Sequence, residues 1–389
     1  MRKEIVVLGA GKIGRGSVGL FFTEAGWQVD FYGHNPQKMA KLAEKGFYET
    51  RDDLGQTKRV EGFHVLECED DHELVEALGR VNVCAIAAYE GAFPSMAASI
   101  GRAVQSRSDA GFEEPLNVML CVNDVHCYET VDAGIRAQLD EKATAYYERN
   151  VGLCYVMVMS LGGTPGPDDD PWLVLTSSDP LLTVDADTWH GEQIEVPHTE
   201  FAPRGRAMIV RKVFCGNMSH AMRAFVGHAK GMSYMDDGIL DDPWSNWINA
   251  QAFDEALFAV TGEYEFDPEE LEEYRAEQEK EIKPAHDPFT RVGNSPGKKL
   301  SYDNRFVWPM RMCAKHGRLP YFLALGCAYG LLFLADSVEG ESRPKTREEV
   351  QALVERICGL THEGEGMLRD LVVDSYLAIP ETGLMPQGR

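Results

Sequence analysis

Hydrophobic residues follow two different patterns along the chain. In the first 150 residues, apolar runs alternate with amphipathic segments. EIVVL leads into a glycine turn, after which Val18, Phe21, Phe22 and Ala25 recur at the i, i+3, i+4, i+7 spacing of a helix. Further strand-like runs are WQVDFYG, VNVCAIAA (81–88) and LNVMLC (116–121). Alternating strands and helices predict a doubly wound α/β domain whose parallel sheet is covered on both faces.

The pattern changes beyond residue 150. CYVMVMSL, WLVLTSS and QIEVP are short strand-like runs interrupted by GGTPGPDDDP, and from about residue 205 the periodicity is almost wholly helical. YFLALGCAYGLLFLA (321–335) is shorter than the roughly 20 residues that span a bilayer, so we expect a buried helix begun by Pro320. The predicted organisation is an α/β domain over residues 1–195 followed by a mainly α-helical domain over residues 196–389.

Composition narrows the classes of function. The length of 389 residues favours two domains, and the net charge of −24 argues against nucleic acid as a partner. Nine scattered cysteines without a C-x-x-C pair, and the lack of a charged apolar leader, predict reduced thiols and a cytoplasmic location. The eleven histidines contain no H-x-x-x-H or H-E-x-x-H pair, so no metal site is predicted.

The turn after the first strand has the spacing G-x-G-x-x-G. Its first glycine permits the tight turn, the second lets a pyrophosphate approach the backbone, and the third lets helix and strand pack closely. Glycines also serve turns that bind nothing, but the position between a strand and a helix favours a Rossmann-like dinucleotide site. The predicted cofactor-binding residues of this turn are Gly9, Gly11, Lys12, Ile13 and Gly14.

Gly33, His34 and Asn35 follow the second strand, where a carboxylate would bind the adenosine ribose. We predict that these three residues contact the cofactor. Asp30 lies earlier, inside the strand, where we expect it to face the surface or a turn. Because the three positions offer neither an acid to repel a 2′-phosphate nor an arginine to bind one, NAD and NADP both remain open.

The segment RKVFCGNMSHAMRAF (211–225) carries Lys212, Asn217 and His220 among apolar residues. Burial lowers the pKa of a lysine, which allows it to act as a general base. In a regular helix Asn217 and His220 share a face and Lys212 lies about 80° from His220. The alternative is that Lys212 extends to solvent and that the other two are satisfied core residues; the spacing alone favours neither interpretation.

Lys-x-x-x-x-Asn-x-x-His resembles the signature of the polyol-specific long-chain (mannitol) dehydrogenases, particularly their mannitol-1-phosphate 5-dehydrogenase branch. The opening GAGKIGRG, the CVN turn with Asn123 and DPFTRVGNSPGKKLSYDNRF (287–306) also resemble that branch, so the likeness covers nearly the whole chain. The resemblance implies a Rossmann domain, a helical substrate domain and metal-free hydride transfer between NAD and a polyol. It further implies Lys212 as base beside Asn217 and His220, with substrate contacts from Asn123, Arg291 and Lys299.

The 287–306 segment is basic in an acidic protein, with Arg291, Lys298, Lys299 and Arg305 among Gly, Pro, Ser and Asn. Such a loop can bind a phosphate or a carboxylate. The alternative is a surface patch paired with neighbouring acids; the strong negative net charge favours a ligand site. Because relatives that use uncharged sugars carry similar cations, the loop leaves open whether the substrate is phosphorylated.

Three positions depart from the family pattern. Val158, Met159 and Ser160 stand where the branch has Val-Asp-Arg, AAYEGAF (87–93) replaces an Ala-Val-Gly turn, and Gly33 replaces the ribose-binding acid. An intact catalytic trio with an altered surrounding predicts a dehydrogenase with a changed substrate. The alternatives are a hexuronate (fructuronate or tagaturonate) reductase and a non-catalytic nucleotide-binding regulator on the same fold. We expect a small-molecule polyol, ketose or sugar phosphate as partner, no nucleic acid or membrane, and a monomer or homodimer.

Overall fold

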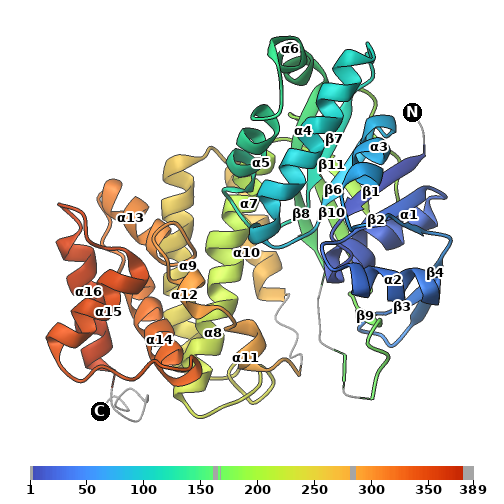
Figure 1. The fold of residues 1–389 in the computed structure, drawn as a ribbon. Coiled ribbons are helices and arrows are strands. Elements are labelled where there is room, and N and C mark those ends of the chain that lie inside the picture. The colour runs from blue at the N-terminus through green and yellow to red at the C-terminus, as the bar shows by residue number, and fades with distance from the viewer. Residues whose placement is uncertain (1–2, 161–164, 167, 281–285, 380–389) are drawn as a thin grey trace. The chain divides into compact units, whose positions relative to one another are not determined.

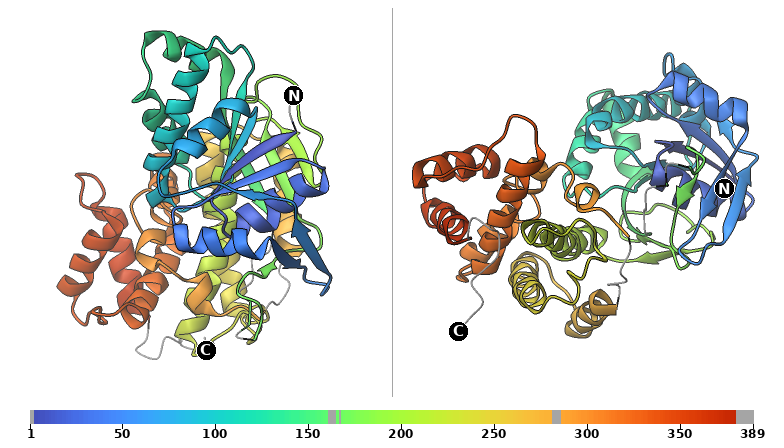
Figure 2. Two further views of the ribbon diagram at one scale, coloured as in Figure 1. Left: turned by 45° about the vertical axis from the view of Figure 1, so that its right-hand side comes forward. Right: turned by 90° about the horizontal axis from the view of Figure 1, so that it is seen from below.

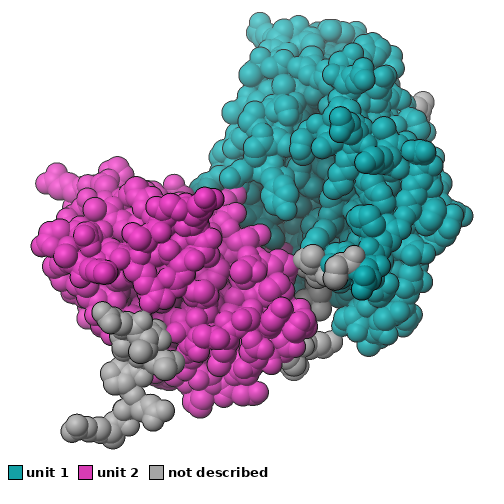
Figure 3. Space-filling view, turned by 60° about the horizontal axis from the view of Figure 1, so that its bottom comes forward, with its two compact units in different colours: residues 1–209 teal, residues 210–389 magenta. Residues whose placement is uncertain are grey.

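The computed structural model describes residues 3–160, 165–166, 168–280 and 286–379 (Figure 1). They divide into two compact units, unit 1 being Met1–Ile209 and unit 2 Val210–Arg389 (Figure 3). Unit 1 is built on a large sheet and unit 2 is helical, which confirms the predicted order of an α/β and a helical domain. The predicted boundary at residues 195/196 lies inside unit 1.

The sheet of unit 1 has eight strands in the order β11-β10-β8-β7-β6-β1-β2-β5. Their bounds are β1 (Glu4–Leu8), β2 (Gln28–Tyr32), β5 (His64–Val65), β6 (Val83–Ile86), β7 (Leu116–Leu120), β8 (Val151–Met159), β10 (Leu181–Asp185) and β11 (Thr199–Ala202). Neighbouring strands are parallel from β5 to β8, and β10 is antiparallel to β8. Since β1 lies between β2 and β6, the strand order reverses there, and ligands of such sheets bind outside the carboxyl ends of the strands at this point.

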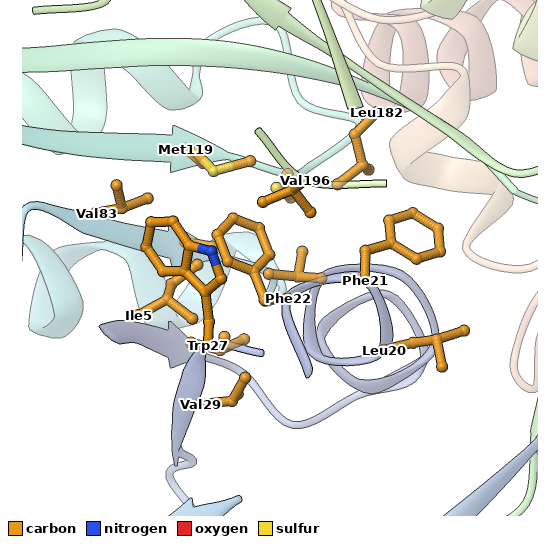
Figure 4. Packing of buried hydrophobic residues seen from close by; sticks show 14 of the residues in the cluster. Ile5, Leu20, Phe21, Phe22, Trp27, Val29, Val83, Met119, Leu182 and Val196 are labelled. Atoms are coloured by element: carbon orange, nitrogen blue, oxygen red, sulfur yellow. The ribbon is translucent and has the colours of Figure 1, made fainter. Parts of the chain in front are cut away.

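Helices lie on both sides of this sheet (Figures 1 and 2). The segment after β1 forms η1, a π-helix (Gly14–Gly19), and continues as α1 (Leu20–Glu24). Figure 4 shows Phe22 and Trp27 near Ile5 and Val83 of the sheet; the two rings pack edge to face with centroids 5.1 Å apart. Val6, which alternates with Ile5, is equally buried, so both faces are covered. The other helices of unit 1 are α2 (Pro36–Lys45), α3 (His72–Arg80), η2 (Glu90–Ala92), α4 (Phe93–Asp109), α5 (Cys127–Arg136), α6 (Glu141–Asn150) and most of α7 (Gly205–Arg211).

A second sheet in unit 1 was not predicted from the sequence. It has the order β4-β3-β9 and consists of β3 (Phe47–Arg51), β4 (Thr57–Glu61) and β9 (Val174–Leu175). Of the predicted strand WLVLTSS, only the two residues of β9 form a strand. The predicted strand QIEVP does not form, because the strand that pairs with β10 is β11, which begins later in the chain. Part of the GGTPGPDDDP loop lies outside the described residues.

Unit 2 surrounds one apolar helix. Its elements are η3 (Lys212–Gly216), α8 (Asn217–Ala229), α9 (Pro243–Glu263), α10 (Pro268–Lys280), α11 (Phe289–Val292), α12 (Pro296–Lys299), α13 (Val307–Lys315), α14 (Tyr321–Ser337), α15 (Arg347–Cys358) and α16 (Gly366–Ala378). α14 is the buried helix predicted from the sequence, with Pro320 at its N-cap. Buried Glu255 of α9 accepts the backbone N–H groups of Phe322 and Leu323 at 3.0 and 2.9 Å, which satisfies the first turn of α14.

The cysteines and the apolar helices bear on two further predictions from the sequence. All nine cysteines are unpaired, in agreement with the predicted thiols. In the described ranges, no helix combines the length and the apolar character needed to cross a bilayer.

The glycine turn is held by two close backbone approaches. Gly9 has φ +113°, and a Cβ there would lie 2.3 Å from the Ala87 carbonyl oxygen. A Cβ on Gly14 would lie 1.8 Å from the carbonyl oxygen of Gly9, so the start of η1 rests directly on the turn. Only glycine fits these two positions without displacing backbone.

We expect Gly14→Ala to lower the free energy of unfolding of unit 1 by about 3 kcal/mol or more, because the new methyl group must move backbone rather than a side chain. Chemical denaturation followed by circular dichroism measures the loss. Gly11→Ala is the matched control, since a Cβ there meets nothing within 4 Å. Equal stability of the two variants would contradict the packing described here.

Candidate active site

The turn between β1 and η1 presents backbone to solvent at the switch point of the sheet. Gly9 N–H donates to the Tyr32 carbonyl at 2.8 Å, which ties the turn to the end of β2. Gly11 and Lys12 are exposed, Ile13 is half-buried, and the space beside Gly11 is open. This open backbone is a cradle that a side chain would fill, so the residues present fit a dinucleotide pyrophosphate.

The end of β2 lies next to this turn and offers no carboxylate at its last positions. Gly33 is buried, and a Cβ there would lie 2.7 Å from Met39 Sδ; His34 is exposed. Asn35 caps α2 by accepting the Lys38 N–H at 2.9 Å. The expectation that Asp30 faces the surface or a turn is wrong: it is 4% exposed and pairs with Arg80 at 2.9 Å, because β2 is covered on both sides.

Two more predicted residues lie at the same carboxyl edge of the sheet. Asn123 is exposed in the loop after β7. Met159 is the last residue of β8, and the Ser160 hydroxyl lies 3.0 Å from that of Thr176. Since β1, β2, β6, β7 and β8 are parallel, the residues that follow them share one edge. The sheet thus gathers Gly9–Gly14, Gly33–Asn35 and Asn123 at one side of unit 1.

The segment with Lys212, Asn217 and His220 is helical, as predicted, but it is not a regular α-helix. Lys212–Gly216 forms the π-turn η3, in which the Asn217 N–H donates to the Lys212 carbonyl. An i→i+5 bond places Lys212 one turn before Asn217, as the i→i+4 bond does in an α-helix. In a regular helix these two residues would be about 140° apart. The π-turn therefore aligns Lys212 with Asn217, and His220 follows three residues later in α8.

Asn217 carries an unsatisfied group. Its side-chain Nδ2 is shielded from solvent and has no hydrogen-bond partner in the part of the chain that the structure describes. Its backbone carbonyl accepts a 3.4 Å hydrogen bond from Arg305. A buried donor without an acceptor costs about 1–3 kcal/mol. The site therefore has a donor that a ligand oxygen can satisfy.

Two cations of the basic loop contact other residues of the same loop. Arg291 makes a two-pronged ion pair with Asp287, four residues earlier. Lys299 is 6% exposed and donates to the backbone carbonyl of Asn294 and, at 2.8 Å, to its Oδ1. Ser295 between them has φ +49°, an uncommon conformation for a residue with a side chain. Arg291 is thus paired with an acid, as the surface-patch alternative supposed, whereas Lys299 has only neutral partners among the described residues.

The electrostatics around His220 favour bound negative charge. Desolvation, together with the charges of Arg305, Lys298 and Arg291, lowers the pKa of Lys299 to about 7. Burial alone lowers the pKa of Arg305 to about 10. At neutral pH these groups form a cationic cluster with incomplete compensation.

His220 is a neutral donor or acceptor at pH 7. Desolvation lowers its pKa to about 4, with Asp287 opposing the shift and Arg291, Arg305 and Arg223 adding to it. His220 is exposed to solvent, which weakens the desolvation effect, but the three guanidinium groups act in the same direction. Arg223 was missed in the sequence; its i+3 spacing from His220 is the signal that places it there.

Comparison with known proteins gives consistent matches over both units. The family model described as the Mannitol dehydrogenase Rossmann domain matches residues 3–162, and the Mannitol dehydrogenase C-terminal domain matches residues 206–356. A relative named mannitol-1-phosphate 5-dehydrogenase from Thermoanaerobacter pseudethanolicus is 24% identical over 97% of this chain and 98% of its own length. One of the same name from Halalkalibacterium halodurans is 26% identical over 92% of this chain and 96% of its own.

Two solved structures share the fold. Pseudomonas fluorescens mannitol 2-dehydrogenase, in a ternary complex with NAD and D-mannitol, has a TM-score of 0.76 and 16% identity over 98% of this chain and 93% of that one. Substrate-free D-sorbitol dehydrogenase has a TM-score of 0.71 and 16% identity over 97% and 93%. Both have the architecture described above. In the described ranges, no cluster of three or more His, Cys, Asp or Glu side chains is placed to hold a metal ion.

We expect the stability of unit 2 to rise with pH because of Lys299. Its pKa is about 7 in the folded state and near 10.5 when unfolded, so between these values the unfolded chain binds more protons. The buried ammonium group of Lys299 lowers the free energy of unfolding most below pH 7. This cost falls as Lys299 loses its proton at higher pH. From pH 7 to 9.5 the effect is about 2–3 kcal/mol, measured as the difference in unfolding free energy between the wild type and Lys299→Met.

Lys298→Met is the matched control, since Lys298 is the exposed neighbour. Its difference from the wild type should change little over the same range. If Lys298→Met and Lys299→Met showed the same pH dependence, Lys299 would not be the titrating group.

Proposed function

Because the chain belongs to the mannitol dehydrogenase family, we propose that it is an NAD-dependent oxidoreductase that interconverts a sugar alcohol, or its phosphate, and the corresponding ketose. Relatives named mannitol-1-phosphate 5-dehydrogenase align with 90% or more of this chain in several cases, which supports this class of reaction. The specific substrate and the role of the lysine are parts of the proposal.

The observation that carries the proposal is the π-turn at Lys212. It aligns an amine with the orphaned amide of Asn217, one turn before His220. π-turns are rare and frequently occur at functional sites.

Each residue has a distinct part in the reaction. The Lys212 amine accepts the proton of the substrate hydroxyl group. The Asn217 amide donates to the same oxygen as it becomes a carbonyl, and this satisfies the orphaned Nδ2. Neutral His220 orients an adjacent hydroxyl. When bound, a nicotinamide cofactor would supply the acceptor for the hydride that leaves the carbinol carbon.

The cofactor is assigned to the backbone cradle at Gly9–Gly14 with Lys12 and Ile13. Gly33, His34 and Asn35 contact its adenosine ribose, and NAD is the cofactor in the related complex with mannitol 2-dehydrogenase. Because these last positions have no carboxylate to reject a 2′-phosphate, NADP is tested beside NAD.

The substrate is assigned a negative charge on the basis of Lys299 and Arg305, which lack carboxylate partners among the described residues. A phosphate matches the names of the relatives. A carboxylate, as in a hexuronate, is the second candidate, because Met159 ends β8 where the family pattern has an acid. Substrate contacts from Asn123 and from Arg291 are part of the proposal because the resemblance to the family implies them.

The proposal is tested by following oxidation of NADH and, separately, of NADPH by the purified protein. The ketose panel contains fructose 6-phosphate, fructose, fructuronate and tagaturonate. Oxidation that depends on fructose 6-phosphate supports the polyol phosphate, and dependence on a hexuronate supports the second candidate. A protein that binds the dinucleotide but turns over no member of the panel would favour a nucleotide-binding regulator.

We expect Lys212→Met to lower kcat by at least about 10³-fold while the Kd for NADH stays within twofold, since the proton acceptor is lost but the cradle in unit 1 is intact. Steady-state kinetics and fluorescence titration give the two values. Lys230→Met, at the other end of α8, is the control and should retain turnover. Near-wild-type kcat in Lys212→Met would remove the lysine from the mechanism.

A further inference from the structure

We propose that Arg15 is a positioning residue for the pyrophosphate of the dinucleotide, an inference that rests on the proposed function. Arg15 follows the last glycine of the turn and is 5% exposed. Nε donates to the Ala10 carbonyl at 2.9 Å, and a terminal nitrogen donates to the Trp172 carbonyl at 2.5 Å. Arg15 thus joins the turn to the segment that leads into β9.

The hydrogen bond to Ala10 fixes the orientation of one peptide group. In a trans peptide the carbonyl and the following N–H point in opposite directions, and this chain has no cis peptide in its described residues. With the Ala10 carbonyl held by Arg15, the Gly11 N–H is directed to the other side of the turn. Gly11 is exposed and the space beside it is open, so this N–H is available to a phosphate oxygen.

The charge of Arg15 also lacks a local partner. Within the described ranges, no carboxylate lies at ion-pair distance from it, and Asp170, which attracts it from further away, is paired with Lys45. The Tyr48 and Trp172 rings lie 5.3 Å from the guanidinium carbon and compensate only part of the charge. A buried cation without a counter-ion is costly, and a pyrophosphate on the turn supplies the missing negative charge.

The same side chain couples the turn to the Trp172 segment. That segment is further held by the Lys45–Asp170 pair, by the 3.0 Å Arg51–Asp169 pair and by β9 pairing with β3. Ordering of the turn by a ligand is therefore transmitted through Arg15 to residues 168–175. Hydrogen exchange in this segment of the wild-type protein therefore tests the role of Arg15 without a substitution.

The experiment is fluorescence titration of NADH into the wild type, Arg15→Lys and Arg15→Met. A lysine reaches one carbonyl but not both, so we expect Arg15→Lys to raise the Kd about tenfold and Arg15→Met to raise it further. Arg107→Lys is the matched control. Arg107 is 1% exposed and donates to the Val81 and Glu114 carbonyls, which precede β6 and β7 at the opposite edge of the sheet. The Arg107→Lys substitution should lower the free energy of unfolding without changing the Kd for NADH.

Deuterium uptake of peptides over residues 168–176 is measured in the wild type with and without NADH, and we expect protection on binding. A wild type that binds neither NADH nor NADPH overturns the proposed function together with this inference. A wild type that binds while Arg15→Lys keeps its affinity overturns the role of Arg15 alone. If the Arg15 variants do not fold, unchanged uptake in the wild-type segment overturns it.

Discussion

The contact between Gly14 and the Gly9 carbonyl is the constraint on which unit 1 depends. It brings the start of η1 against the end of β1, closer than any side chain allows. The helix then covers the sheet from the first residue after the turn, and β1 can be central, with β2 and β6 beside it. Because the strands from β5 to β8 are all parallel, the loops that follow them share one edge of the sheet. The cofactor cradle is thus a consequence of helix–strand packing.

Both π-helical segments of the described chain occur at motifs to which the proposed function gives chemical roles. η1 begins at the last glycine of the dinucleotide turn, and η3 begins at Lys212. A π-turn inserts one residue into the helical path and changes which side chains align. All six residues of η1 are buried, the polar Arg15 and Ser17 among them. In η3 the π-turn aligns Lys212 with Asn217, which regular helical spacing would separate.

Much of the fold could be predicted because its signals are local. Strand β1, the glycine turn, the buried helix α14 and the change from sheet to helix each follow from periodicity within a short window. The second sheet could not be predicted, since β9 pairs with β3 across more than 100 residues of chain. The burial of Asp30 could not be predicted either, since its partner Arg80 is distant in the sequence.

In the candidate site, too, some features could be predicted from the sequence and others could not. Lys212, Asn217 and His220 are close in sequence and could be singled out there, but their spacing alone favoured no role, and the π-turn leaves no mark in hydrophobic periodicity. The Arg291–Asp287 pair has i,i+4 spacing and was readable, but the loop composition concealed the helical turn of α11. Arg15 was passed over because its partners, Ala10 and Trp172, are backbone carbonyls, which no residue type reveals.

Each unit of this protein of net charge −24 buries a cation that has no carboxylate partner among the residues that the structure describes. Acidic side chains are abundant, yet Arg15 and Lys299 are both buried beside neutral acceptors. Each position therefore favours an anion brought by a ligand, a pyrophosphate in unit 1 and a phosphate or carboxylate in unit 2. Desolvation and the neighbouring cations lower the pKa of Lys299 to about 7, so its ammonium group loses a proton more readily than that of an exposed lysine. An anion bound there stabilises the ammonium form, so binding of a charged substrate is coupled to proton uptake, whereas an uncharged polyol would leave the proton count of Lys299 unchanged.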